Sequence, residues 1–237
     1  MISVITPTIR PDALKLVEKA LKNQDYTDFE WLICSPFDPE IPSATCLTDD
    51  FKGGFWSLNR AYSALIEAAR GEYIVSWQDN IWAKPDMLSR LLFQTERTGG
   101  LVSPVGDQYA ELDEYGRPTR KIWSDPRKTD KYGTFYEVNY EDIEWNLCIC
   151  PKRLIEDIGG VDIAMDFLGF GMDMFQINDR LNDNGGHFFI DQTLESYTLR
   201  HGRERDNWDA DHLMHGGYQK RKDELKSMGE WPVLKST

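Results

Sequence analysis

Apolar runs and helical spacings alternate along the first hundred residues of the chain. Runs rich in β-branched and aromatic residues, which predict buried strands, occupy residues 2–6, 29–35, 72–77 and 101–105. Between the runs, apolar residues such as Leu14, Val17 and Leu21 recur every three or four positions, which predicts amphipathic helices. Four strands alternating with three helices predict an α/β fold with a mostly parallel sheet and helices on both faces.

Residues typical of helix ends stand between these segments. Pro11 and Asp12 suit the first turn of a helix, and Pro85 is expected to open another. Gly71 and Gly99 each follow the last apolar position of a helical pattern, where glycine often ends a helix. The nearly continuous apolar character of residues 72–77 indicates a strand that is covered on both faces.

The regular alternation ends near residue 106. Residues 107–144 are polar, aromatic and rich in turn residues, and a connection of this length is more often functional than passive. The later patterns predict strands at 146–151, 187–191 and 196–200, helices at 152–160 and 172–186, and a charged surface helix at 218–229. We expect one domain over residues 1–237, made of a nucleotide-binding half (1–105), an acceptor and catalytic half (106–205) and a C-terminal tail (206–237).

Composition indicates a globular protein that stays in the cytoplasm. Apolar residues make up 41% of the 237 residues and aromatic residues 12%, which is enough for a large core. No apolar run approaches the roughly 20 residues of a membrane-spanning helix, and no basic segment precedes an apolar one at the N-terminus. The four cysteines lack the spacing of a metal site, so we expect reduced thiols in the core.

The charge of the chain argues against general binding to nucleic acid. The formal net charge is −13, whereas phosphate backbones favour a basic surface. Residues 117–131 are a local exception, with six basic residues against two acidic ones. Such a loop is usually solvated, but it could also face an anionic acceptor.

Polar clusters follow the first three predicted strands. They are Thr6-Pro7-Thr8-Ile9-Arg10, Ser35-Pro36-Phe37-Asp38 and Gln78-Asp79-Asn80. Ligands of open parallel sheets bind beyond the carboxyl ends of the strands, so the three clusters are expected at one edge. Each cluster alone also suits an ordinary turn.

Two segments resemble family 2 glycosyltransferases of the GT-A type. Residues 1–33 are similar to the opening of these enzymes, and residues 59–80, NRAYSALIEAARGEYIVSWQDN, are similar to the segment that leads into their Asp-x-Asp motif. A looser likeness extends through Gly159-Gly160-Val161-Asp162 and Gly169-Phe170-Gly171-Met172-Asp173 to Arg180-Leu181 and covers residues 1–201. The resemblance implies a GT-A-like, Rossmann-type sheet with an extension on the acceptor side.

The resemblance also implies roles for particular residues. Thr6, Pro7, Thr8, Arg10 and Asp38 would contact the base and ribose of a UDP- or GDP-sugar donor. Arg60 would lie near the donor phosphates, and Gln78 would stand in the first position of Asp-x-Asp. The acceptor would be a glycan or another compound with a hydroxyl group.

A divalent cation is expected at the Gln78-Asp79-Asn80 cluster, with Asp79, Asn80 and His201 as its ligands. Mn²⁺ suits such a set better than Mg²⁺, because Mg²⁺ prefers oxygen ligands to imidazole. The family pattern has carboxylates where this chain has Gln78 and Asn80. An amide oxygen brings no charge, so the cluster should hold a cation more weakly than the family motif does. His201 is equally suited to be a surface histidine.

Asp173 is the expected general base of an inverting transfer, with Asp166 in reserve and Asp162 expected to cap a turn. A carboxylate at the start of a helix also stabilises that helix, so Asp173 could have this structural role instead of a catalytic one. The aromatic residues of the irregular segment suit a small core under a long loop or stacking on sugar rings: Trp123, Tyr132, Phe135, Tyr136, Tyr140 and Trp145.

Three functions fit these observations. The first is sugar transfer from a nucleotide diphosphate donor to a hydroxyl, with inversion and help from a metal ion. The second is glycosylation of modified nucleic-acid bases, for which the basic segment 117–131 is the only indication. The third is a catalytically inactive domain that binds nucleotide sugars, which the altered Asp-x-Asp motif favours.

Overall fold

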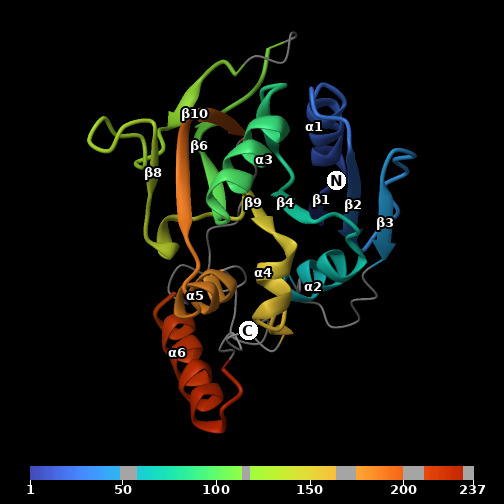
Figure 1. Cartoon of the computed structure of the whole chain (residues 1–237). Coiled ribbons are helices and arrows are strands. Elements are labelled where there is room, and N and C mark those ends of the chain that lie inside the picture. The colour runs from blue at the N-terminus through green and yellow to red at the C-terminus, as the bar shows by residue number, and fades with distance from the viewer. Residues whose placement is uncertain (49–57, 114–117, 164–174, 200–210, 232–237) are drawn as a thin grey trace.

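The computed structural model describes residues 1–48, 58–113, 118–163, 175–199 and 211–231. Within these residues the chain is an α/β protein with a mixed, mostly parallel ten-stranded sheet and six α-helices (Figure 1). The strands are β1 (Ile2–Pro7), β2 (Phe29–Ser35), β3 (Thr45–Thr48), β4 (Tyr73–Trp77), β5 (Ile81–Ala83), β6 (Leu101–Tyr109), β7 (Lys121–Trp123), β8 (Phe135–Glu137), β9 (Leu147–Pro151) and β10 (Phe188–Leu199). The helices are α1 (Pro11–Lys22), α2 (Leu58–Ala68), α3 (Met87–Thr98), α4 (Lys152–Asp157), α5 (Phe175–Asp183) and α6 (Asp211–Met228), with a 3₁₀ turn, η1, at Tyr140–Asp142.

The sheet follows the order β3-β2-β1-β4-β9-β6-β10-β5, with β7 beside β6 and β8 beside β10. The ladders among β1, β2, β3 and β4 are parallel, as the alternating pattern predicts. The prediction of a mostly parallel sheet is confirmed, and β9 is an antiparallel strand within it, between β4 and β6. The sequence pattern of β9 indicates a strand but contains nothing that selects its neighbours.

Two cores cover the two faces of the sheet. Leu14 and Val17 of α1 pack with Leu88 and Leu91 of α3 against one face. Helices α2, α4 and α5 cover the other face, where Leu65, Ile155 and Ile177 are fully buried. Both faces of β4 are therefore covered, as its continuous apolar sequence predicts.

Two glycines have identifiable structural roles, one in a close approach of two elements and one at the end of a helix. A Cβ atom on Gly71 would lie 2.6 Å from the backbone nitrogen of Ser3, so glycine lets the chain pass tightly from α2 into β4. Gly99 ends α3 in a left-handed conformation with φ of 71°, as expected for a glycine after a helix. The start of α3 is at Met87, two residues later than Pro85 predicts.

The second half is more regular than its sequence indicates. The two strands expected at 187–191 and 196–200 are one long strand, β10, which continues through an irregularity between Asp191 and Glu195. Strands β7 and β8 and the turn η1 lie within the predicted irregular segment. The predicted charged helix at 218–229 is part of α6, which lies beside α5 at one end of the molecule (Figure 1).

The described helices include none that is long and apolar enough to cross a membrane. The four cysteines are free. Cys34, Cys148 and Cys150 are buried, as predicted, but Cys46 is exposed on the edge strand β3. The prediction of four core thiols is wrong at Cys46 because β3 covers only the margin of the sheet.

Candidate functional site

The carboxyl ends of β1, β2 and β4 lie at one edge of the sheet, which brings two of the predicted polar clusters into contact. In the parallel ladders Pro7 pairs with Cys34, and Ile5 pairs with Ser76. The chain leaves β1 through Thr8 and leaves β4 through Gln78, so both loops emerge next to each other. This edge is the place where open α/β sheets bind ligands.

Asp79 is the centre of the contacts between these loops. Its Oδ2 accepts hydrogen bonds from the Thr8 hydroxyl at 2.5 Å and from Nε of Arg10 at 2.9 Å. Its Oδ1 accepts a second bond from the Arg10 guanidinium, through Nη2. The Asp79 side chain is 3% exposed and that of Arg10 38% exposed, so the carboxylate is enclosed while the guanidinium borders solvent.

Local backbone features aim these side chains at each other. The Thr8 hydroxyl also accepts a hydrogen bond from the Arg10 backbone N–H at 2.9 Å, which tightens the turn before α1. On the other loop, Asn80 has a left-handed backbone with φ of 62°, which asparagine tolerates better than most residues. The Asn80 carbonyl accepts a bond from the Leu199 N–H at 2.8 Å and so joins the loop to the end of β10. The cluster after β4 is therefore a turn and also a polar site.

Gln78 connects the edge to the second half of the chain. Its side-chain amide donates to the Tyr62 hydroxyl of α2 at 3.2 Å. Its backbone N–H donates to the carbonyl of Asn146, the residue just before β9, at 2.9 Å. Arg60, also on α2, is partly exposed.

The other predicted nucleotide-contacting residues differ in their surroundings. Thr6 is fully buried, and its hydroxyl donates to the Trp77 carbonyl at 2.7 Å and accepts from the Trp31 indole at 3.0 Å. Pro7 is the buried last residue of β1. Asp38 is exposed after β2, and its carboxylate accepts the Glu40 backbone N–H at 2.9 Å, as in an ordinary turn. Thr6 and Pro7 thus shape the edge, and Thr8 and Arg10 face it.

Asp173, its alternative Asp166, and His201 lie outside the described residues. Asp162, expected to cap a turn, pairs with Arg221 of α6 at 3.5 Å, and its backbone N–H donates to the Gln176 side chain at 2.9 Å. The assignment of a general base stays a prediction from the sequence.

The structure describes two of the three predicted cation ligands, Asp79 and Asn80, but not His201. The described residues include no group of three or more histidine, cysteine, aspartate or glutamate side chains able to hold a metal ion. Gln78 directs its amide to Tyr62, and both carboxylate oxygens of Asp79 already accept bonds from Arg10. Asn80 donates to Asp79 at 3.5 Å. The charge that a cation would balance is balanced by a guanidinium instead.

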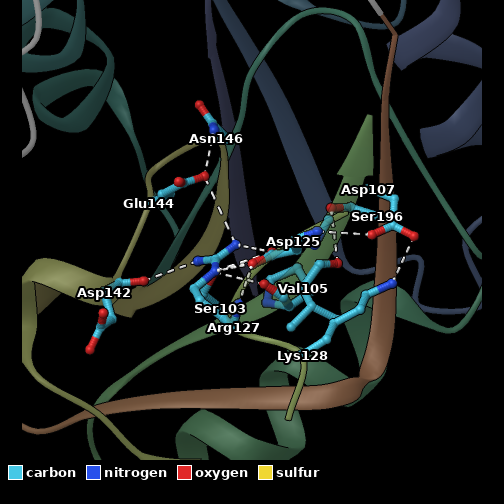
Figure 2. A network of polar contacts seen from close by, with 12 residues as sticks. Ser103, Val105, Asp107, Asp125, Arg127, Lys128, Asp142, Glu144, Asn146 and Ser196 are labelled. Carbon is cyan, nitrogen blue, oxygen red and sulfur yellow. Dashed lines mark hydrogen bonds and ion pairs between the residues drawn. The ribbon is translucent and has the colours of Figure 1, made fainter. Parts of the chain in front are cut away.

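A network of ion pairs fastens the segment 107–144 to β6 (Figure 2). The fully buried carboxylate of Asp125 accepts the Gly106 N–H at 2.8 Å and Nε of Arg127 at 2.9 Å. Arg127 also donates to the Asp142 carbonyl at 3.0 Å and approaches Glu144 to 3.9 Å. Asn146 donates to Glu144 at 2.9 Å, so the network reaches the residue that binds the Gln78 backbone.

Three of the six basic residues in 117–131 are neutralised within this network. Asp107 pairs with Lys121 at 2.6 Å and with Lys128 at 3.0 Å, and Arg127 pairs with Asp125. These three cations hold the segment in place through their acidic partners. A nucleic-acid acceptor stays a prediction from the sequence.

The carboxylates of the network have perturbed pKa values. Burial by itself would raise the pKa of Asp125, but the hydrogen bonds and charge of Arg127 outweigh it and lower the pKa below its usual value. Burial would also raise the pKa of Asp107, but hydrogen bonds from Lys121 and Lys128 outweigh it and lower the pKa below its usual value. Both groups are therefore carboxylates at neutral pH.

A group of aromatic residues beside the Asn80 turn was not expected from the sequence. Trp82 of β5 stacks on Tyr197 of β10 with ring centres 5.5 Å apart, and Tyr109 of β6 meets Tyr197 edge-on at 5.5 Å. All three are partly exposed. The sequence of β5 could have indicated this group, because alternate residues of a strand point to opposite sides. Ile81 and Ala83 are buried, and Trp82 between them is partly exposed.

The aromatic residues of the irregular segment have different environments. Trp145 is buried in the core, Phe135 stacks on Phe189, and Trp123 is 46% exposed. Tyr132 and Tyr136 line a groove of about 830 Å³ near the start of β10. Because β10 runs parallel to β6, this groove lies toward the opposite end of the sheet from Asp79.

No protein-family model matches the chain, and no curated protein matches it.

Proposed function

We propose that this protein is a glycosyltransferase that moves a sugar from a nucleotide diphosphate donor to an acceptor hydroxyl. The observation that supports it most is the cluster of Thr8, Arg10 and Asp79 at the joined carboxyl ends of β1 and β4. A loop that follows the first strand and a loop that ends on Gln78-Asp79-Asn80 are the two segments whose sequences resemble such enzymes. Their contact is what a donor site at this edge requires.

In this proposal the donor lies across the ends of β1 and β4. Arg10 and Arg60 favour its phosphates, and Asp38 is placed after β2 to meet the base or ribose. The half-buried rings of Trp82, Tyr109 and Tyr197 offer apolar faces for a sugar next to the Asn80 turn. Asp173 is the proposed base for an inverting transfer.

A domain that binds nucleotide sugars without turning them over is the second candidate. The pairing of Asp79 with Arg10 favours it, because a carboxylate held by a guanidinium is less free to bind a catalytic metal. Both candidates bind a nucleotide sugar, so binding alone does not separate them. Only the active enzyme should release nucleoside diphosphate from the donor.

The test combines a thermal-shift panel of UDP- and GDP-sugars with an assay for released nucleoside diphosphate. A donor that binds only the folded protein raises the melting temperature by mass action. We expect one base to give a shift and a sugar donor of that base to be turned over, by hydrolysis or by transfer to added glycans. Asp173→Asn should keep the shift and lower turnover by about 10²-fold or more, because asparagine accepts no proton.

Asp166→Asn is the matched control for the assignment of Asp173 as the base. Its turnover should fall much less than that of Asp173→Asn. Full turnover by Asp173→Asn would move the base to another residue. A melting-temperature shift without any diphosphate release, across donors and acceptors, would favour the inactive binding domain. A panel without any shift or release would reject the proposed function.

A further inference from the structure

The contacts of Asp79 leave it poorly suited to bind a metal ion. Its two oxygens accept three hydrogen bonds from Thr8 and Arg10 together, and its side chain is 3% exposed. A cation bound to either oxygen would have to displace the guanidinium or lie against it. Like charges at contact distance repel strongly, above all where solvent is excluded.

The residues beside Asp79 add no negative charge that could offset this repulsion. Gln78 and Asn80 are amides, and the pair of Asp79 and Arg10 is neutral as a unit. The donor set described at this turn thus contains one carboxylate, and that carboxylate is already compensated. A diphosphate, by contrast, needs a partner whose N–H donors point outward to its oxygens, and a guanidinium that is paired on one side only can be that partner.

Arg10 is arranged as such a partner. A guanidinium has five N–H donors, and Asp79 engages two of them. The Arg10 side chain is 38% exposed, so its outer side borders solvent while Asp79 fixes its inner side. The fork of a guanidinium matches the oxygens of a phosphate, and a fixed guanidinium loses little freedom when it binds one.

We propose that the N–H donors of Arg10 that Asp79 does not engage bind the donor diphosphate, and that this binding needs no divalent cation. The inference rests on the proposed function and assigns both residues different tasks from the predicted ones, which were metal binding for Asp79 and contact with the base and ribose for Arg10. Asp79 is a positioning residue that orients Arg10, and Thr8 orients Asp79. The nucleotide is bound by side chains of the chain itself.

Calorimetric titration of UDP and GDP tests the proposal without requiring turnover. The protein is titrated once in excess EDTA and once in excess Mn²⁺. We expect the better nucleotide to bind with affinities that agree within about twofold in the two conditions. Arg10→Ala should weaken binding at least tenfold in both, which is about the loss of one charge-assisted hydrogen bond.

Two further variants separate this role from general damage. Asp79→Asn should weaken binding by similar factors in EDTA and in Mn²⁺, because it loosens Arg10 rather than removing a metal ligand. Arg153→Ala is the control, since Arg153 is 82% exposed on α4, whose preceding strand β9 ends at the opposite edge of the sheet. It should leave the affinity unchanged, and circular dichroism should show each variant folded.

The possible results are distinct. Binding in Mn²⁺ that weakens tenfold or more in EDTA, or an Asp79→Asn loss confined to Mn²⁺, overturns the role of Arg10 and leaves the proposed glycosyltransferase standing. Unchanged affinity of a folded Arg10→Ala variant overturns it as well. No binding of either nucleotide in either condition rejects the proposed function, and the inference with it.

Discussion

At the scale of single residues, two of the charge pairs in this protein differ in exposure and in role. Arg10 and Asp79 lie at the proposed site, with the guanidinium partly open to solvent. Arg127 and Asp125 lie deeper, with side-chain exposures of 14% and 0%, and join the segment 107–144 to β6. The first pair is placed to bind a ligand, and the second holds the structure around it.

Asp125→Asn should destabilise the protein at neutral pH by about 3 kcal/mol, because it leaves Arg127 buried without its carboxylate. The pKa of Asp125 is lowered in the folded state, so its contribution is complete above the ordinary carboxyl pKa of about 3.9 and is lost as the pH falls through the lower folded value. Urea unfolding of both proteins from pH 7 to pH 3 should show the difference shrinking below about pH 4.

Asp157→Asn provides the comparison, because Asp157 pairs with Arg153 at 3.8 Å on the exposed face of α4. That variant should change the free energy of unfolding by less than about 0.5 kcal/mol at any pH in the range. A difference for Asp125→Asn that is equally small at pH 7, or that is unchanged at pH 3, would contradict the assigned role.

At the scale of elements, a group of polar contacts fixes α6 to α5. Asp179 of α5 accepts the Tyr218 hydroxyl at 2.5 Å and the Lys222 ammonium at 2.6 Å. Burial, followed by the hydrogen bond and charge of Asp179, raises the pKa of Tyr218, which keeps the phenol protonated as a donor. Trp231 adds a bond to Asp183 at 3.0 Å, and Lys222 lies over its ring.

Tyr218→Phe should loosen α6 before it affects the sheet. The change removes one hydrogen bond to a charged group, which contributes about 1.5–3 kcal/mol, and leaves the ring in place. Hydrogen exchange measured by mass spectrometry should show faster exchange in α6 and unchanged exchange in β1 and β4. Lys220→Ala is the control, because Lys220 is exposed on the same helix. If both variants exchange in α6 at the wild-type rate, the hydrogen bond from Tyr218 to Asp179 does not stabilise α6.

At the scale of the whole molecule, one sheet joins the two predicted halves of the chain. Strand β9 of the second half lies between β4 and β6 of the first, and β10 extends alongside β6 (Figure 1). The formal net charge is −13, and three of the six basic residues in the segment 117–131 pair with acidic groups. Such a charge disfavours binding to a polyanion.

The protein should therefore pass through a duplex-DNA column without retention, even at about 50 mM salt, where phosphate contacts are strongest. A basic protein of similar size, loaded on the same column, checks that the column binds. Retention that disappears as the salt concentration rises would instead support an acceptor of nucleic-acid type and would reopen the second of the three predicted functions.

The sequence predicts the elements well where the determining interactions are local. The spacing of Leu14, Val17 and Leu21 defines α1, and Gly99 ends α3, because a helix is selected by residues three or four positions apart and by its own ends. Edge strand β3 was missed among prolines, and β7 and β8 were missed in the irregular segment, since strands of three or four residues have too little pattern of their own.

What the sequence alone determined is the alternation of strands and helices and the placement of Thr8, Arg10 and Asp79 just beyond strand ends. Only the tertiary structure decided the partners: Arg10 meets Asp79 across 69 positions, and β9 enters between β4 and β6. Periodicity records which face of an element is buried, but it does not record which other element covers that face. For Asp79 the difference is chemical, since a guanidinium binds both oxygens of the carboxylate that the sequence predicts as a metal ligand.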